Sequence, residues 1–453
     1  MSNVVDLIDQ TFFDFERASG AHRVGQVVWV YNRSVDIDGL RRFHHHLQQG
    51  RLARRVERSP LPFGRHRWVS PGVQPELEIV ATPRPREEFD VWLKEQASIP
   101  LDVERGPGWH LAVLPFTDGG AGVSFIASHC LTDGFGGVLA VMEAASGNDH
   151  AIDWPAAGSR RRWRALREDA RQIVRDIRGI RRALCAAPAL LDHDGGGSPA
   201  PQRSTPPVAL VEADERITPP TATILIDADE WEARACALGG TSNSLLEGVA
   251  ARLAQAVGRV TADGSATLGI PVNLRTADDT RANAITDVEI TVDPTRATTD
   301  LREIRSATKQ ALIDLQQVPD ERMALLPLVP LMPKPLIRRF ANVYTPSTTA
   351  VVSSHLGPAP SIVNRPDGTD ADRMWLLSVC PDVPKATVYR SNGMMELILG
   401  EVNGRVFVSV LAYQPGRLSS NDELRRVLSS IIDDFSLTAS IGWPTNEPAG
   451  LAR

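Results

Sequence analysis

Residues 124–137, SFIASHCLTDGFGG, place a histidine and an aspartate at the end of an apolar run. The ordinary pKa of histidine lies near 6.5, so a neutral His129 could take a proton from a hydroxyl or an amine near neutral pH. Asp133 follows four residues later across a tight turn, where it could bind a distant arginine and lock the loop. Gly134 permits a positive φ and a close approach of the backbone. A pattern this short can arise by chance in 453 residues, so a histidine that merely ends a strand is the alternative.

The remaining histidines and the cysteines do not indicate a metal site. His44, His45 and His46 are consecutive on an expected helix and point about 100° apart, so they cannot converge on one ion. The four cysteines are scattered and form no CxxC pair, which is typical of isolated buried thiols in a reducing compartment. We therefore expect no metal and no permanently bound cofactor.

The composition excludes several classes of protein. A formal net charge of -6 provides no overall basic field for nucleic acid. The apolar fraction of 42% and the charged fraction of 23% are typical of a soluble globular protein. The first residues, MSNVVDLIDQ, lack the apolar core of a secretory signal, and no stretch approaches the roughly 18 apolar residues of a membrane span. We expect a cytoplasmic protein with no transmembrane segment and no nucleic-acid partner.

The elements expected around the histidine would hold it on rigid backbone. Apolar, β-branched runs predict strands at 24–31, 111–116 and 123–128, so His129 would directly follow a buried strand. A helix of small residues at 138–145 would begin just after the glycines. Later in the chain the same patterns predict strands at 223–226, 267–274, 350–353, 375–378, 396–399 and 406–413, and helices at 229–238, 300–315 and 421–435.

The chain divides at one segment of biased composition. Residues 192–220 begin DHDGGGSPAPQRSTPP and lose all periodicity, which is typical of a linker. They separate an N-terminal half, 1–191, from a C-terminal half, 221–453. Each half mixes strands and helices, so the expected fold class is mixed α/β in two halves.

An arginine-rich segment precedes this linker. Residues 160–182 have a helical apolar stripe that includes Trp163, set among many arginines. A basic amphipathic helix of this kind could lie on an anionic bilayer and bring the protein to a membrane surface. It could equally pack its stripe on the body of the protein, with arginine–carboxylate pairs outside.

Several segments, in the same order along the chain, resemble the acyltransferase superfamily related to chloramphenicol acetyltransferase. SHCLTDG resembles the HHxxxDG motif of that superfamily, which includes peptide-synthetase condensation domains and the wax ester synthase/diacylglycerol acyltransferases. The last group is matched further by DQTFFDFE at 9–16, PGW at 107–109, IPVNLR at 270–275, Asn283, and SSHLGP at 353–358. A collinear match over most of the chain is far more specific than the hexapeptide.

The resemblance implies two chloramphenicol-acetyltransferase-like halves that form a V, with a tunnel between them. It implies that His129 is the general base and that Asp133 is a structural aspartate paired with Arg275. Gly134, which follows Asp133, would also support the loop. It also implies an acyl-CoA or acyl-carrier-protein thioester as donor, and a lipid hydroxyl, such as diacylglycerol or a long-chain alcohol, as acceptor.

Three departures from the family pattern keep other functions open. Ser128 replaces the first histidine of HHxxxDG, Gly108 replaces the leucine of PLW, and Ser354 replaces the asparagine of SNxPGP. Contacts to the oxyanion or the acceptor could come from Asn273, Ser353 or Ser354. The alternatives are a free-standing condensation-like domain that uses a carrier-protein thioester to form an ester or amide, and a degenerate, non-catalytic paralogue that binds lipid.

Overall fold

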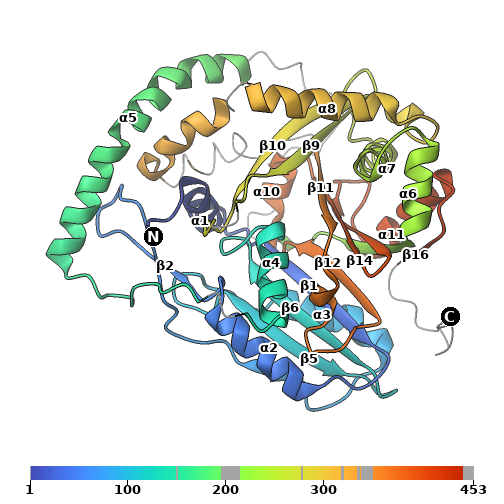
Figure 1. Ribbon diagram of the computed structural model, residues 1–453. Helices are drawn as coiled ribbons and strands as arrows, with labels where there is room; N and C mark the ends of the chain where they lie inside the picture. The colour runs from blue at the N-terminus through green and yellow to red at the C-terminus, as the bar shows by residue number, and fades with distance from the viewer. Residues whose placement is uncertain are drawn as a thin grey trace.

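Two β-sheets organise the chain into two lobes, as Figure 1 shows for the computed structural model. The structure describes residues 2–148, 151–194, 215–276, 279–317, 321–333, 337 and 350–441. The predicted linker, 192–220, lies mostly outside the described residues. Of its ends, residues up to Asp194 continue helix α5, and Arg216–Ile217 form the short strand β7.

The first sheet has the strand order β12-β1-β6-β5-β4. Its members are β12 (Arg373–Val379), β1 (Val24–Tyr31), β6 (Ala121–Ser128), β5 (Trp109–Pro115) and β4 (Leu77–Ile79). Every residue of β6 is buried because helices cover both faces of the sheet. Trp29 packs edge-on against Phe43 of α2 (Ile37–Gln49), whereas Gln26 on the opposite face donates to the carbonyl of Leu93 in α3 (Phe89–Ala97).

Strand β12 reaches the first sheet from the second half of the chain. It pairs antiparallel with β1 over seven positions, from Val24↔Val379 to Val30↔Arg373. The residues before it are fixed to the same lobe: Trp29 Nε1 donates to the carbonyl of Val363 at 2.9 Å. Sequence reasoning placed all of 221–453 in one half, and the structure adds that this segment completes the sheet of the other half.

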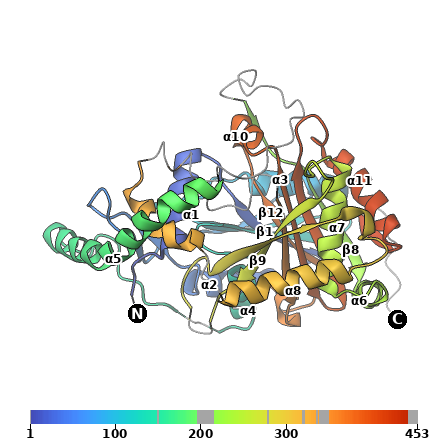
Figure 2. The same cartoon turned by 90° about the horizontal axis from the view of Figure 1, so that it is seen from above.

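The second sheet has the order β10-β9-β11-β14-β15-β8-β16. Its strands are β10 (Ile285–Val292), β9 (Ala266–Asn273), β11 (Val351–Pro358), β14 (Met394–Val402), β15 (Arg405–Tyr413), β8 (Thr221–Asp227) and β16 (Ala439–Ile441). One face carries α6 (Ala228–Ala237), α7 (Ser242–Ala256), α8 (Arg302–Gln317) and α11 (Asn421–Asp434), which Figure 2 shows side by side. The other face meets the first lobe. On β14, Leu397 and Leu399 point into the second core, the hydrophobic core between this sheet and its helices, whereas Ile398 points the opposite way, into the core of the first lobe.

The remaining elements lie around this frame. Helix α1 (Leu7–Ser19) packs beside the 3₁₀ segment η4 (Glu321–Leu331), and α5 (Arg162–Asp194) runs along the periphery (Figure 1). Among the residues described, no helix is both long enough and apolar enough to span a membrane. The other elements are α4 (Gly134–Ala145), α10 (Lys385–Arg390), β2 (Arg55–Glu57), β3 (Arg67–Val69), β13 (Val383–Pro384), η1 (Arg86–Glu88), η3 (Pro294–Arg296) and η6 (Ser361–Asn364).

Candidate active site

His129 directly follows β6, and hydrogen bonds to its backbone hold it from both lobes. Its N–H donates to the carbonyl of Arg23 at 2.9 Å, and its carbonyl accepts from Asn283 Nδ2 at 3.1 Å. The imidazole stacks on Phe12 of α1, with ring centroids 4.8 Å apart and an interplanar angle of 22°. The ring is therefore fixed in position before any substrate arrives.

The two nitrogens of the His129 ring differ. Nδ1 is buried and lacks a hydrogen-bond partner, whereas Nε2 has no partner among the residues described and the side chain is partly exposed. Burial is the largest cause that lowers the pKa of His129; Arg23 lowers it further, and Glu396 and Asp133 oppose the shift. These effects favour the neutral ring at neutral pH, a form in which one ring nitrogen can accept a proton.

Asp133 forms no hydrogen bond with the imidazole; it organises the loop and the helix after it. It is the N-cap of α4, and its Oδ1 accepts the N–H of Gly136 at 2.6 Å. Its Oδ2 accepts Arg275 Nη2 and the backbone N–H of Ala284, each at 2.8 Å. The Asp133 carboxylate therefore fastens the start of α4 to the second lobe.

Arg275 completes this clamp. The side chains of Arg275 and Asp133 are only 4% and 2% exposed, so the ion pair is buried. Arg275 also donates to the carbonyl of Arg281 at 2.8 Å and to that of Ala282 at 3.0 Å. One guanidinium thus binds both the aspartate and the loop of the second lobe, which a lysine could not do with the same geometry.

The glycines of the motif allow close packing rather than unusual dihedral angles. Gly134 is the first residue of α4 and does not have a positive φ, so that part of the sequence interpretation is wrong. A Cβ at Gly134 would lie 3.2 Å from Leu356 of β11, so the expected close approach is present. A Cβ at Gly136 would lie 2.5 Å from Thr132 Oγ1 and 3.0 Å from Arg275 Nη2, so a side chain there would disturb the clamp.

An ion pair between the lobes lies beside the histidine and was not predicted. Arg23 Nη1 donates to Glu396 Oε2 at 2.7 Å, which joins the start of β1 to β14. The two groups affect the pKa of His129 in opposite directions. Nothing in the local sequence relates the two residues, since 373 positions separate them.

The N-terminal helix also supports the site, and its sequence carried a signal. Asp9 Oδ1 accepts the backbone N–H of Asn283 at 2.7 Å, and Asp9 Oδ2 accepts that of Ala282 at 3.0 Å. Burial raises the pKa of Asp9 to about 6, although Arg54 opposes the shift. Asp9, Phe12 and Asn283 all lie in segments that carry the family resemblance, so this resemblance could have identified them as supporting residues.

The three candidate oxyanion or acceptor contacts lie in different surroundings. Ser353 is fully buried on the face of β11 that meets the second core, and its hydroxyl lacks a hydrogen-bond partner. Ser354 is partly exposed on the opposite face, which is also the face of Glu396, because Val352 pairs with Glu396 in the parallel register. Asn273 is exposed at the end of β9, and its Oδ1 accepts the N–H of Arg275 at 3.0 Å.

Two of the departures from the family pattern have a local structural explanation. Ser128 is buried, and its hydroxyl accepts the N–H of Cys130 at 3.2 Å, so it supports the turn that carries His129. At Gly108 a Cβ would collide with Leu131, which already fills that space. Neither replacement leaves the histidine loop without support.

Comparisons with known proteins rest on structure alone. No protein-family model matches the chain, and no curated protein matches it significantly. The first condensation domain of the calcium-dependent antibiotic synthetase, solved with a substrate analogue, has a TM-score of 0.57 and 12% identity, with 96% of each chain covered. A mutant starter condensation domain of rhizomide synthetase in complex with C8-CoA has a TM-score of 0.52 and 14% identity, with 97% of this chain and 98% of that chain covered.

An enzyme of lipid synthesis has the same architecture. The wax ester synthase/diacylglycerol acyltransferase from Marinobacter aquaeolei VT8 has a TM-score of 0.54 and 15% identity, with 96% of this chain and all 100% of that chain covered. Identities this low show the fold and not the reaction. The predicted fold class is confirmed: the chain has the two-lobed, mixed α/β fold of condensation domains and of this acyltransferase.

Proposed function

We propose that the chain is an acyltransferase that moves a fatty acyl group from acyl-CoA to the hydroxyl of a lipid or alcohol. One observation carries this proposal. A neutral, partly exposed histidine with a lowered pKa lies at a strand end, on a loop that a buried Asp133–Arg275 pair fixes to the opposite lobe. Rigid placement of a neutral imidazole is what general-base catalysis requires.

In the proposed reaction, Nε2 of His129 takes the proton from the acceptor hydroxyl as its oxygen attacks the thioester carbonyl. The carbonyl carbon becomes tetrahedral, and negative charge develops on its oxygen. When this intermediate collapses, the carbon–sulfur bond breaks and the departing thiolate receives the proton from the imidazolium. The products are an ester and free CoA, and the reaction needs no acyl-enzyme.

For the developing negative charge we propose Ser354 as the hydrogen-bond donor. It lies on the face of β11 that looks toward the first lobe, whereas Ser353 points into the second core. The side chain of Asn273 already holds the backbone N–H of Arg275. Loss of one such donor typically lowers kcat by about 10²- to 10³-fold.

The donor and the acceptor are tested together by product detection. Purified protein is incubated with mixed acyl-CoA and alcohol panels, and products are identified by mass spectrometry. Acyl-carrier protein is then tested in place of acyl-CoA, and amines in place of alcohols. Product formed only from the carrier-protein thioester, or only with amines, would indicate a condensation-like domain instead. Lipid binding without product from any pairing would indicate a non-catalytic paralogue and would contradict the proposal.

We also propose that helix α5 brings the enzyme to an anionic membrane surface. Its inner side is anchored, since Asp169 is buried and accepts from both Arg67 and Arg160 at 2.9 Å. Its outer side exposes large apolar groups: Trp163 is 84% exposed, Val174 65%, Leu184 58% and Ile177 43%. At about 100° per residue these lie on one side of the helix, and Arg167, Arg171, Arg178 and Arg181 lie on the same side. Apolar groups flanked by cations are complementary to the interface of an anionic bilayer.

Vesicle sedimentation tests this surface. We expect binding to vesicles that contain phosphatidylserine, weak binding to pure phosphatidylcholine, and loss of binding in a Trp163→Ser/Val174→Ser variant. A matched control is Val91→Ser on α3, which removes an apolar group that is 54% exposed elsewhere. Equal binding by both variants would show that α5 is not the contact.

A further inference from the structure

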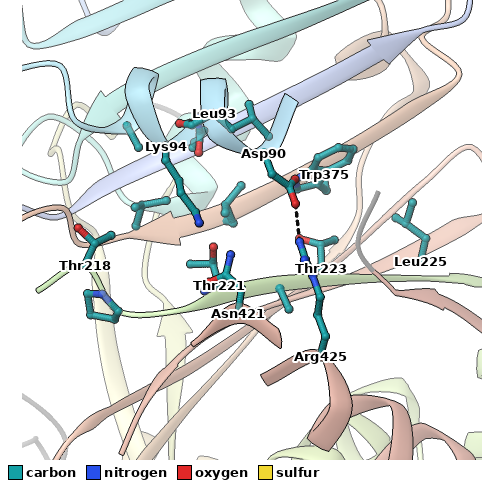
Figure 3. Close-up of a pocket in the computed structure, with 16 residues that line it drawn as sticks. Asp90, Leu93, Lys94, Thr218, Thr221, Thr223, Leu225, Trp375, Asn421 and Arg425 are labelled. Atoms are coloured by element: carbon teal, nitrogen blue, oxygen red, sulfur yellow. Dashed lines mark hydrogen bonds and ion pairs between the residues drawn. The ribbon is translucent and has the colours of Figure 1, made fainter. Parts of the chain in front are cut away.

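A cavity of about 150 Å³ lies between the two lobes, and none of His129, Asp133 or Arg275 lines it. Figure 3 shows its surroundings: α3 and the first sheet on one side, and β8 with the start of α11 on the other. The mechanism proposed above does not use it.

The floor of the cavity is apolar. Strand β12 contributes Trp375, Leu377 and Val379, which alternate along the strand and so share one face. Leu225 of β8 and Leu93 of α3 close it from the two lobes. A cavity of about this volume with an apolar lining holds a molecule the size of benzene.

One uncompensated cation faces this space. Lys94 is an exposed residue of the lining; it projects from α3 toward Thr221 and Asn421 (Figure 3), and no carboxylate among the described residues pairs with it. The other charged residues of the lining, Asp90 and Arg425, form an ion pair with each other across the lobes. The cavity therefore carries a net charge of about one positive unit at neutral pH.

Further polar groups surround this cation and the inner end. Asn421 Oδ1 accepts the N–H of Thr221 at 3.2 Å, which leaves the amide NH₂ of Asn421 as a donor at the cavity wall. Asn421 is also the first residue of α11; the acidic Asp422 and Glu423 in the same first turn offset the positive potential of that helix end. At the inner end Gln26, only 2% exposed, donates to Leu93 and Ser124, and its Oε1 accepts no hydrogen bond from the residues described.

We propose that this cavity binds a small carboxylic acid as its anion, with the carboxylate at Lys94 and Asn421 and a short apolar chain on the β12 floor. One free ammonium matches one carboxylate, and a charge-assisted hydrogen bond of this type is a strong polar contact. A phosphate ion has no apolar chain to cover the β12 floor, so it would use the cation alone. A neutral alcohol of the same length would not use the cation.

Occupancy would also join the lobes. The ligand would touch α3 and β12 in the first sheet's lobe, and β8 and α11 in the other. A ligand that binds only when the two lobes are packed together in this way stabilises the folded protein by mass action. Binding should therefore raise the unfolding temperature in proportion to the logarithm of ligand concentration.

Calorimetric titration with sodium hexanoate tests the proposal, with sodium phosphate and hexanol as competing chemistries. We expect saturable binding of hexanoate alone, and Lys94→Met to weaken it about tenfold or more, since a charge-assisted contact is lost. Lys309→Met removes an exposed lysine of α8 and should bind as the wild type does. His129→Ala should also bind hexanoate normally, which separates this site from the reaction centre.

Lysine acetylation locates the ligand. The chain has only four lysines, Lys94, Lys309, Lys334 and Lys385, so each can be followed by mass spectrometry. Hexanoate should slow the acetylation of Lys94 and leave that of Lys309 unchanged. Unaltered acetylation of Lys94, equal affinity in Lys94→Met, or equal binding of phosphate or hexanol would overturn the proposal.

Discussion

The imidazole of His129 is tuned by its neighbours, and this tuning can be measured. Burial and Arg23 lower its pKa, so the protonated, inactive form should predominate only below pH 6.5. We expect kcat/KM to rise with pH along an acidic limb whose midpoint lies below this value. A pH–rate profile with the midpoint clearly above 6.5 would contradict the assignment.

The ion pair next to His129 sets the position of that limb. Glu396 raises the pKa of His129, so Glu396→Gln should move the acidic limb to lower pH; the loss also leaves Arg23 unpaired, which acts in the same direction. Glu401→Gln, on the same strand β14, is the matched control and should leave the profile in place. A shift to higher pH in Glu396→Gln would show that this interpretation is wrong.

Two neighbouring glycines of α4 should respond in opposite ways to alanine. Gly136→Ala would press a methyl group on Thr132 and Arg275, and we expect a loss of roughly 1–3 kcal/mol in the free energy of unfolding. At Gly137 the nearest atom is 3.8 Å away, so Gly137→Ala should stabilise the helix by about 0.5–1 kcal/mol. Urea denaturation of the two variants measures both effects, and equal changes would contradict the packing account.

Helix α4 and the loop before β10 are joined by the buried Asp133–Arg275 pair. Arg275→Met would leave the carboxylate without its cation, and we expect a loss of about 3 kcal/mol or more in unfolding free energy. Arg302→Met breaks a pair with Asp300 at the start of α8 in which both side chains are well exposed, 77% and 39%, so its cost should stay within about 1 kcal/mol. A similar cost for both variants in chemical denaturation would count against a special role for the clamp.

Helices and strands were predicted well where the apolar residues of one short segment alone reveal the element. The apolar run at 24–31 is strand β1, and the helix expected at 421–435 is α11, Asn421–Asp434. Strand β10, Ile285–Val292, was missed, although the burial of its residues alternates for most of its length. Only one face of this strand is buried, so polar residues alternate with the apolar ones and the segment has no continuous apolar run.

The arrangement of the whole molecule depends on contacts that periodicity cannot reveal. The sequence indicated two α/β halves, but not that β12 leaves one half to pair with β1 of the other. Pairing of strands about 350 positions apart depends on tertiary packing, as does the Arg23–Glu396 pair beside the site. The tunnel expected between the halves, and their boundary at 192–220, stay predictions.

The second lobe should give the molecule a measurable dependence of stability on pH. Burial raises the pKa of Glu247 to about 8, from an ordinary value of 4.5. A raised carboxyl pKa stabilises the fold while the group is protonated, so this contribution is complete below pH 4.5 and is lost as pH rises to about 8. The slope from this group is at most about 1.4 kcal/mol per pH unit.

Glu247→Gln should flatten this dependence, because the amide keeps the shape and cannot ionise. Glu303→Gln, exposed on α8, provides a control that should leave the slope unchanged. The measurement is the free energy of unfolding by urea between pH 5 and 8. An unchanged slope in Glu247→Gln would mean that Glu247 is already ionised across this range.

The central claim is that His129 is the base for acyl transfer, and one comparison tests it most directly. Ester formation from acyl-CoA and an alcohol panel is followed by mass spectrometry for the wild type and His129→Ala, with the unfolding temperature of each recorded. We expect the wild type to form ester, and His129→Ala to be slower by at least about 10²-fold at a nearly unchanged unfolding temperature. Ester formation at a similar rate by both proteins would contradict the account.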